Sequence, residues 1–464
     1  MIDRSKLSAD PAAAGADHRS WGLYPRIGAQ DVTVVAGRDD TEGLFAGHGP
    51  LLPYGLGRSY GDSCLNEGGT LLDTSSLRRF ISFDELTGTL RCEAGVTLGD
   101  ILELGIPRGW FLPTSPGTKF VTVGGAIAND VHGKNHHVAG TFGRHVTQLE
   151  LLRSNGERLV CSPSKNRELF QATIGGLGLT GLILWAEIRL RKVDGPFIDM
   201  ESIRFSNLSE FFEIEAESEE HYEFTMSFVD AATTGKAAGR GLFMRGNHAW
   251  QKHIPGKSGV SRQRLNFPVM APGFLLNKLS VTLVNNLLYY KQPAKRVSAT
   301  VPFDPFFYPL DSIGNWNRMY GTRGFIQHQC VVPPEHGADA MYELFDLIAS
   351  SGEAAMLAVL KKFGELESPG ILSFPRPGLT LALDFPMKGA RTLDLCDRMD
   401  EVVLKYGGAI YPAKDARMAP ATFKASFPRW QEFSKYVDPR FSSSFWRRVT
   451  AGEPAASSGE MTPT

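Results

Sequence analysis

The chain has 464 residues, enough for two domains or one large two-lobed unit, and its 42% hydrophobic and 21% charged residues are typical of a globular protein. Its formal net charge of -1 gives no basic excess, so a nucleic-acid partner is not expected. The five cysteines are scattered without a CxxC spacing, which argues against a disulfide framework or a zinc site. The N-terminus lacks the apolar core of a secretory signal, and no run of about 18 uncharged apolar residues is present to span a membrane.

The first part of the chain is predicted to alternate strands with short helices. Thr97 and Asp100 stand at a spacing close to that of a capping box, so a helix is expected to begin there. Asn155-Gly156 is a strong turn signal between two strands. Strands are expected at 71–74, 79–83, 89–92, 146–152, 158–161 and 179–190, with the second and third forming a hairpin.

The composition changes around 192–196, where glycine becomes less frequent and aromatic residues more frequent. We therefore expect a first domain over 1–194 and a second over 195–407. The polar cluster YPAKDARM lies in the segment 408–450, which is predicted to return to the first domain. Residues 451–464 are small and polar, which is typical of a disordered tail. Strands are expected at 327–332 and 380–385, and helices at 341–348 and 393–405.

A glycine-rich loop, GLGRSYGD at 55–62, follows the apolar run 51–54. Such a loop is able to present several backbone N–H groups to one anion, for example a pyrophosphate. A tight surface turn explains the same glycines equally well. The spacing matches neither a GxxxxGK[ST] loop nor a GxGxxG fingerprint, which disfavours a nicotinamide cofactor on a Rossmann fold.

A second glycine-rich segment reads PGT at 116–118 and TVGGAIA at 122–128. Two glycines at the start of a helix allow the backbone to approach a ligand. Close packing of a helix on a strand is the alternative, although it requires only one glycine. Two such loops about sixty residues apart favour a dinucleotide more than either does alone.

The segment HGKNHH at 132–137 places three histidines within six residues. A metal site is disfavoured, because no carboxylate or cysteine stands at metal-ligand spacing and Gly133 indicates a loop. The alternative is a group of hydrogen-bond donors beside a cofactor or an anionic substrate. His132 is also a candidate for proton transfer.

These three segments, followed by GGLGLTG at 175–181, resemble in their order the FAD domain of the vanillyl-alcohol oxidase superfamily. The resemblance covers roughly 21–437 and is strongest to its polyprenylphosphoryl-ribose 2′-oxidase branch. Further matching strings are FFYPLDSIGNWNRMYG, GFIQHQ, LSFPRPG, LDFPMK and YPAKDAR. The resemblance implies an α+β, two-lobed FAD-binding fold with an α+β substrate (cap) domain.

The resemblance also implies FAD as cofactor. In several relatives a histidine of the first glycine loop is linked to the flavin, but this chain has Arg58 at that place, so noncovalent binding is expected. The residues implied to line FAD are Pro53, Tyr54, Gly55, Leu56, Gly57, Arg58, Ser59, Tyr60, Gly61, Asp62, Ser63, Gly117, Thr122, Val123, Gly124, Gly125, His132, Gly133, Lys134, Asn135, Ile183 and Tyr411.

The implied catalytic residues are Lys414, His132 and Tyr60, of which the first two are the candidates for the proton acceptor. The positions implied to bind substrate are Gln327, Gln329, Lys361, Phe363, Phe307, Thr380 and Ala382. Three of these depart from the family pattern: Phe307 replaces a tyrosine, Thr380 an asparagine and Ala382 a cysteine. A thiol at that last position therefore takes no part in the chemistry.

The reaction implied by the resemblance is oxidation of the 2′-hydroxyl of a polyprenylphosphoryl-β-D-ribose. The 2′-keto product would be an intermediate in an epimerisation towards arabinose for cell-envelope polysaccharide, completed by a short-chain dehydrogenase/reductase partner. Quinone or oxygen would reoxidise the flavin. Two alternatives stay open: an FAD oxidase of free sugars, alditols or sugar lactones, and a flavin-binding protein without turnover.

An apolar segment over 271–290 carries only Lys278 as a charged residue. It predicts either a buried helix of the second domain or a lid that covers a lipid tail or touches a membrane. The second interpretation suits a polyprenyl-phosphate substrate. The expected location is cytoplasmic, peripheral at the inner face of the membrane, or periplasmic.

Overall fold

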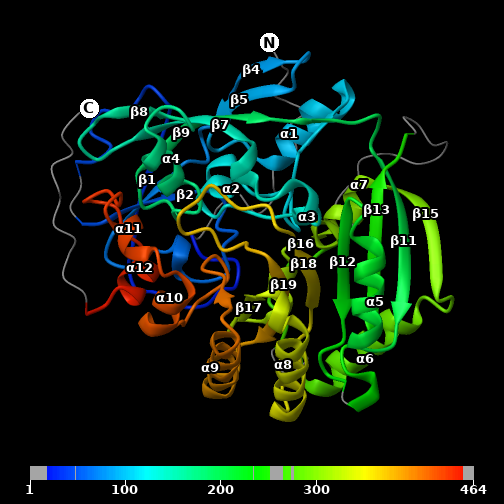
Figure 1. The fold of residues 1–464 in the computed structure, drawn as a ribbon. Coiled ribbons are helices and arrows are strands. Elements are labelled where there is room, and N and C mark those ends of the chain that lie inside the picture. Colours follow the sequence, from blue (N-terminus) through cyan, green and yellow to red (C-terminus); the bar gives the residue numbers. More distant parts are fainter. Residues whose placement is uncertain (1–17, 47–48, 234, 251–264, 273–275, 453–464) are drawn as a thin grey trace.

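The computed structural model describes residues 18–46, 49–233, 235–250, 265–272 and 276–452. The chain forms an α+β fold of two lobes, each built on its own sheets (Figure 1). Most of the tail expected at 451–464 lies outside the described residues. Within the described part of the chain, no helix has the length and hydrophobicity needed to cross a membrane.

The first lobe contains two sheets. A three-stranded parallel sheet has the order β1-β3-β2, and a five-stranded antiparallel sheet has the order β4-β5-β9-β7-β8. The strands are β1 (Asp31–Val34), β2 (Leu51–Tyr54), β3 (Thr70–Asp73), β4 (Phe80–Asp84), β5 (Thr89–Glu93), β7 (Val146–Leu152), β8 (Arg158–Cys161) and β9 (Leu182–Arg189). The short strands β6 (Trp110–Phe111) and β10 (Arg191–Lys192) pair with each other. The predicted hairpin and the predicted pair around Asn155-Gly156 are therefore confirmed.

The helices of the first lobe are short. They are α1 (Leu98–Gly105), α2 (Val123–Ala128), α3 (His136–Ala139) and α4 (Arg167–Thr173). The predicted capping box of α1 is present, because the Thr97 hydroxyl accepts from the Asp100 N–H at 3.0 Å and the Asp100 carboxylate accepts from the Thr97 N–H at 3.0 Å. Two orphan donors at the helix start are thereby satisfied.

The second lobe is built on one eight-stranded antiparallel sheet with the order β15-β11-β13-β12-β18-β19-β17-β20. Its strands are β11 (Phe197–Phe205), β12 (Phe224–Val229), β13 (Gly241–His248), β15 (Arg296–Pro302), β17 (Phe325–Val332), β18 (Ala358–Phe363), β19 (Gly378–Pro386) and β20 (Ala409–Ile410). The strands β14 (Leu265–Asn266) and β16 (Ile313–Gly314) form a separate parallel pair. Its helices are α5 (Leu208–Ser218), α6 (Lys278–Tyr290), α7 (Phe303–Phe307), α8 (Gly337–Ser351) and α9 (Ala390–Lys405). The helices predicted at 341–348 and 393–405 thus form, as α8 and α9.

The last part of the chain returns to the first lobe, as the helices α10 (Pro420–Ser426), α11 (Trp430–Ser434) and α12 (Ser444–Val449) (Figure 1). The backbone of β2 holds this return in place: the Leu51 N–H donates to the Arg440 carbonyl at 2.7 Å, and the Leu51 carbonyl accepts from Ser442 at 2.9 Å. The largest apolar core includes residues from β2, the eight-stranded sheet, α8, α9 and α10–α12. The two lobes are therefore fixed to each other by shared packing as well as by covalent connections.

The interpretation of the apolar segment as a buried helix is wrong. Its helix, α6, exposes Leu279, Leu283 and Leu287 to the extent of 80%, 58% and 63%. Only Val281, among the apolar side chains of the helix, is fully buried. The sequence pattern misleads because a helix with apolar residues on several faces reads as buried even where the fold places nothing over one face.

Candidate active site

A cavity lies between the two lobes and receives residues from both. The first lobe contributes the glycine-rich loop, segments around Gly125 and His132, and Ile183. The second contributes side chains of β12, β17, β18 and β19, and the returning segment contributes Tyr411 and Lys414. The segments singled out in the sequence are thereby brought together, although they stand far apart in the chain.

The first glycine loop lines this cavity with backbone N–H groups. The N–H groups of Gly55, Leu56, Gly57 and Ser59 have no hydrogen-bond acceptor among the described residues. The hydroxyl of Ser63, which also lines the cavity, is buried and has no partner in the same set of residues. Unpaired buried donors are costly, so a bound group with acceptor oxygens fits this loop.

The glycines of this loop are required by its close packing. A Cβ at Gly55 would stand 2.5 Å from the Thr122 hydroxyl, and one at Gly57 would overlap the Tyr54 hydroxyl. Gly57 also has φ +61°, a left-handed conformation that side chains disfavour. The loop is thus held close to Thr122 and to the second glycine segment.

In the second glycine segment, by contrast, the backbone N–H groups are already hydrogen-bonded within the protein. The Gly124 N–H donates to the Ala94 carbonyl at 2.8 Å, and the Gly125 N–H donates to the Thr122 hydroxyl at 3.1 Å. Val123 is fully buried and its N–H donates to Val96 at 2.8 Å. Gly124 and Gly125 line the cavity by the absence of a side chain, so they make room for a ligand instead of binding its charge.

Most of the residues predicted to line FAD do line the cavity. Four are placed elsewhere: Gly61, Asp62, Val123 and Asn135. Asn135 is buried and donates to the Pro113 carbonyl at 2.8 Å, and Gly61 packs against the backbone of Asp415. These four support the cavity wall from behind.

Lys414 is the central polar group of the returning segment. Its Nζ lies 3.7 Å from the centre of the Tyr60 ring. Burial lowers the pKa of Lys414 to about 7, and negative charge at Asp384 opposes this shift. The amine is therefore within reach of its neutral form near neutral pH, which a proton acceptor requires. Burial also raises the pKa of Tyr60 well above its usual value, so its hydroxyl stays protonated.

His132 is held by the second lobe, which is called the cap lobe from here on. The Gln329 amide donates to His132 Nε2 at 3.1 Å and to the Thr380 hydroxyl at 3.2 Å. Burial and the nearby charge of Lys361 hold the pKa of His132 well below its usual value. The ring is therefore neutral, and its accepting nitrogen is occupied by Gln329. The edge of the ring packs on Phe363, 4.7 Å between centroids.

The three positions that depart from the family pattern have distinct surroundings. Ala382 lines the cavity and is paired with Gln329 across the sheet. Thr380 is buried behind the lining, where it accepts from Gln329. Phe307 is buried against Phe224, 4.8 Å between centroids, and its carbonyl accepts from the Lys134 ammonium at 3.1 Å. None of these three side chains supplies a titratable group to the cavity.

The sequence reasoning missed Asp384. This carboxylate is fully buried on β19, accepts a short hydrogen bond from the Gln327 amide and lies 3.5 Å from the Tyr320 hydroxyl. Burial raises its pKa to about 7. The sequence did contain a signal for it. Asp384 stands in the string LDFPMK, two residues after Ala382, and residues two apart in a strand share one face.

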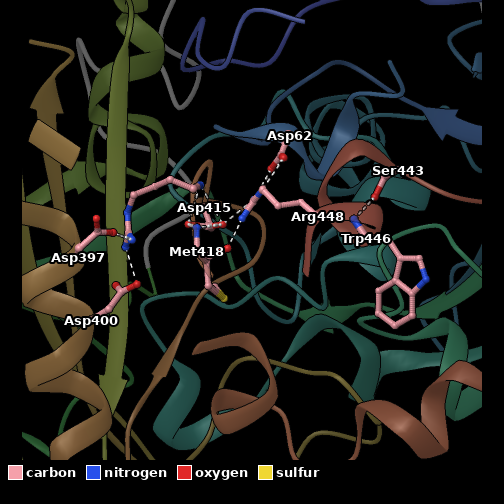
Figure 2. Close-up of polar contacts among 9 residues, drawn as sticks. Asp62, Asp397, Asp400, Asp415, Met418, Ser443, Trp446 and Arg448 are labelled. Carbon is pink, nitrogen blue, oxygen red and sulfur yellow. Dashed lines mark hydrogen bonds and ion pairs between the residues drawn. The ribbon is translucent and has the colours of Figure 1, made fainter. Parts of the chain in front are cut away.

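A second missed group is the ion-pair cluster behind Lys414. Figure 2 shows the side chain of Arg448 between Asp415 and Asp62, to which it donates at 2.8 and 2.7 Å. Asp415 also accepts from the backbone N–H of Met418. Helix α12, the loop that follows Lys414 and the end of the first glycine loop are thereby joined through one guanidinium.

The same cluster continues towards the cap lobe. Arg417 pairs with Asp397 at 2.5 Å and with Asp400 at 2.6 Å, both on α9. Asp400 in turn contacts His328 Nε2 at 2.9 Å, between Gln327 and Gln329 on β17. The residues that follow Lys414 are therefore anchored to both lobes.

Comparisons with known proteins agree with this arrangement. Residues 45–162 match the family model described as an FAD binding domain. The chain is 38% identical, over 91% of its length and 94% of the relative, to decaprenylphosphoryl-β-D-ribose oxidase of Mycolicibacterium smegmatis. It is 32% identical, over 76% of its length and all of the relative, to an uncharacterized protein in the mprA 5′ region of Streptomyces coelicolor. A quarter of the chain is 33% identical to 22% of human delta(24)-sterol reductase.

Proposed function

This chain belongs to the family of FAD-linked oxidoreductases that includes decaprenylphosphoryl-β-D-ribose oxidase, and we propose that it oxidises the 2′-hydroxyl of a polyprenylphosphoryl-β-D-ribose to the ketone. The observation that carries the proposal is the position of Lys414: a buried amine of lowered pKa in a cavity beside the FAD-binding loop and the amides of β17. The identity extends over nearly all of the relative, cap lobe included, which supports a similar substrate.

When bound, FAD supplies the acceptor for the hydride that leaves the carbon. The chain has to accept the hydroxyl proton, and we assign this to Lys414 Nζ in its neutral form. His132 is the weaker candidate, because its accepting nitrogen already receives the Gln329 amide. We propose that His132, Gln327 and Gln329 orient the sugar. The ring of Tyr60 packs against the Lys414 ammonium and holds it in position. Lys361 lines the cavity from β18, whereas Phe363, on the same strand, is fully buried behind the lining and packs on His132.

We propose noncovalent attachment of FAD. The loop Gly55–Ser59 carries Arg58 and no histidine, and Cys64 is the nearest thiol to that loop in sequence, where burial raises its pKa to about 12. A thiol of so high a pKa is a poor nucleophile. Further partners in this proposal are a short-chain dehydrogenase/reductase that consumes the ketone, and quinone or oxygen as electron acceptor.

A peripheral contact with a membrane belongs to the same proposal, because a polyprenyl chain does not lie in water. The described residues expose fifteen large hydrophobic side chains, and nine of them fall between Trp250 and Val297. On α6, the residues Leu279, Leu283 and Leu287 follow one another at four-residue spacing and so share one face. The helix has no acidic residue and is followed by the exposed Lys291, a combination that suits an anionic lipid surface.

Anaerobic mixing tests the proposed substrate. The FAD-loaded enzyme is mixed with a polyprenylphosphoryl-β-D-ribose, with free ribose or arabinose, and with a sugar lactone, and the flavin absorbance is followed. Rapid bleaching by the phosphoryl ribose alone is expected. Bleaching by free sugars or lactones at comparable rates would favour the oxidase of unphosphorylated substrates, and no bleaching by any of them would favour a flavin-binding protein without turnover.

A further inference from the structure

Two lysines reach the cavity, and no carboxylate of the described part of the chain is bound to either of them. Lys134 comes from the first lobe and Lys361 from β18 of the cap lobe. The Lys134 Nζ donates to the Phe307 carbonyl at 3.1 Å, and the Lys361 Nζ donates to the Gly133 carbonyl at 2.7 Å. Within the described ranges, neither ammonium group takes part in an ion pair. Among the residues that the structure describes, the acceptors of the two ammonium groups are thus two neutral carbonyls.

Two buried ammonium groups close to each other are unfavourable when no anion is bound. Burial lowers the pKa of Lys134 to about 8, although Asp311 opposes that shift. Burial and the charge of Lys134 together lower the pKa of Lys361 to about 7. An ammonium has three N–H donors, and each of these two is seen to use one. An anion between the two lysines would remove their repulsion and occupy the remaining donors.

We propose that Lys134 and Lys361 form a binding site for the phosphate group of a glycosyl phosphate substrate. The inference rests on the proposed function and adds the part of the site that recognises the phosphate. A phosphate suits the pair because its oxygens are strong acceptors and its charge matches two separate ammonium groups. A free sugar, alditol or lactone would leave both cations unneutralised.

The position of Lys361 points to the substrate more than to the phosphates of FAD. Lys361 is paired with Thr380 across the sheet, and Thr380 contacts Gln329, which holds His132. This chain of contacts places Lys361 on the cap strands beside the candidate reacting groups. The N–H groups of Gly55, Leu56, Gly57 and Ser59, which have no acceptor among the described residues, form a separate site in the first lobe that suits the pyrophosphate of FAD.

The neighbouring residue offers a matched control. Lys362 is one position further along β18, is absent from the cavity lining, and pairs instead with Glu219 at 2.6 Å. Successive side chains of a strand point to opposite faces, so the two lysines differ in surroundings but not in strand. Lys361→Met and Lys362→Met remove the same charge from the two faces.

The test uses the FAD-loaded full-length protein and farnesyl phosphate as probe. Binding is measured by the change in flavin absorbance and by calorimetry, FAD content by absorbance after gel filtration, and folding by circular dichroism. We expect Lys361→Met to weaken farnesyl phosphate binding at least tenfold and to retain FAD. We expect Lys362→Met to match the wild type, and farnesol to bind weakly to all three proteins.

Several outcomes would overturn the inference. These are undiminished binding of farnesyl phosphate to Lys361→Met, no binding to the wild type, and loss of FAD from Lys361→Met, which would assign the lysine to the cofactor. Failure of the proposed function is seen separately. If the wild type binds farnesyl phosphate but phosphoryl ribose does not bleach its flavin, the phosphate site stands and the sugar assignment is wrong.

Discussion

The ammonium of Lys414 lies 3.7 Å from the centre of the Tyr60 ring, and no carboxylate among the described residues is in contact with it. Asp384 acts on it only as a nearby charge. A lysine in such a place is available to accept a proton, whereas a surface lysine in an ion pair is not.

Lys414→Ala should reduce the rate of flavin reduction by about a hundredfold to ten-thousandfold, because a positioned proton acceptor is lost. FAD should remain bound. Single-turnover mixing at saturating substrate measures the rate, and Lys405→Ala, an exposed lysine paired with Glu343, is the control. An effect on KM alone would make Lys414 a binding residue, and a wild-type rate would return the role to His132.

The rate of flavin reduction should rise as pH increases through about 7, because the proton acceptor is the neutral amine of Lys414. Asp384→Asn should move this rise to lower pH. A carboxylate stabilises the protonated lysine, so its removal lowers the pKa of Lys414 further. The measurement is single-turnover reduction from pH 5.5 to 9. A rise that stays in place or moves to higher pH in the variant would contradict the proposed coupling.

Gly57→Ala should greatly reduce FAD occupancy, since the new methyl group overlaps the Tyr54 hydroxyl and displaces the loop. Gly68→Ala is the matched control. Gly68 has φ +70° but no atom within 4 Å of an added Cβ, so the substitution should cost only the backbone strain, about 1 kcal/mol. Flavin absorbance of the purified proteins reports occupancy. Equal occupancy in the two variants would show that the left-handed backbone alone matters.

Arg448→Met should destabilise the protein by about 3 kcal/mol, the lower end of the range for breaking a buried ion pair, because 26% of the Arg448 side chain is exposed. The variant leaves Asp62 and Asp415 buried without their shared cation. Arg429→Met, in an exposed pair with Glu432, should cost at most about 1 kcal/mol. Denaturation by urea gives both values, and equal values would show that α12 is held by its apolar packing alone.

Leu283→Glu combined with Leu287→Glu should abolish sedimentation of the protein with vesicles of phosphatidylcholine and phosphatidylglycerol. Two charges on the apolar face of α6 would have to enter the lipid interface. Leu86→Glu, in an exposed hairpin turn where the leucine is 92% exposed, should leave sedimentation unchanged. Vesicle binding by the double variant at the wild-type level would exclude α6 as the membrane contact.

Local structure followed from local sequence wherever a short-range interaction decides it. The capping box at Thr97, the turn at Asn155-Gly156 and the periodicity of α8 and α9 each depend on neighbours within a few residues. The order of the glycine segments also resembled an FAD fold, and the family comparison supports that assignment. Composition and pattern failed for α6, because hydrophobicity by itself does not specify what covers a helix.

By itself, then, the sequence determined the α+β class and indicated FAD as the cofactor, and its resemblance to the family predicted a central place for Lys414. Only the tertiary structure decided which groups surround it. Asp384, Arg448 and the pair Lys134 and Lys361 gain their meaning from contacts across segments far apart in the chain, and the pKa shifts arise from burial, which exists only in the folded protein. The protonation state of a side chain in a cavity depends on how far the fold shields it from water and on which charges lie near it. A local sequence pattern contains neither piece of information.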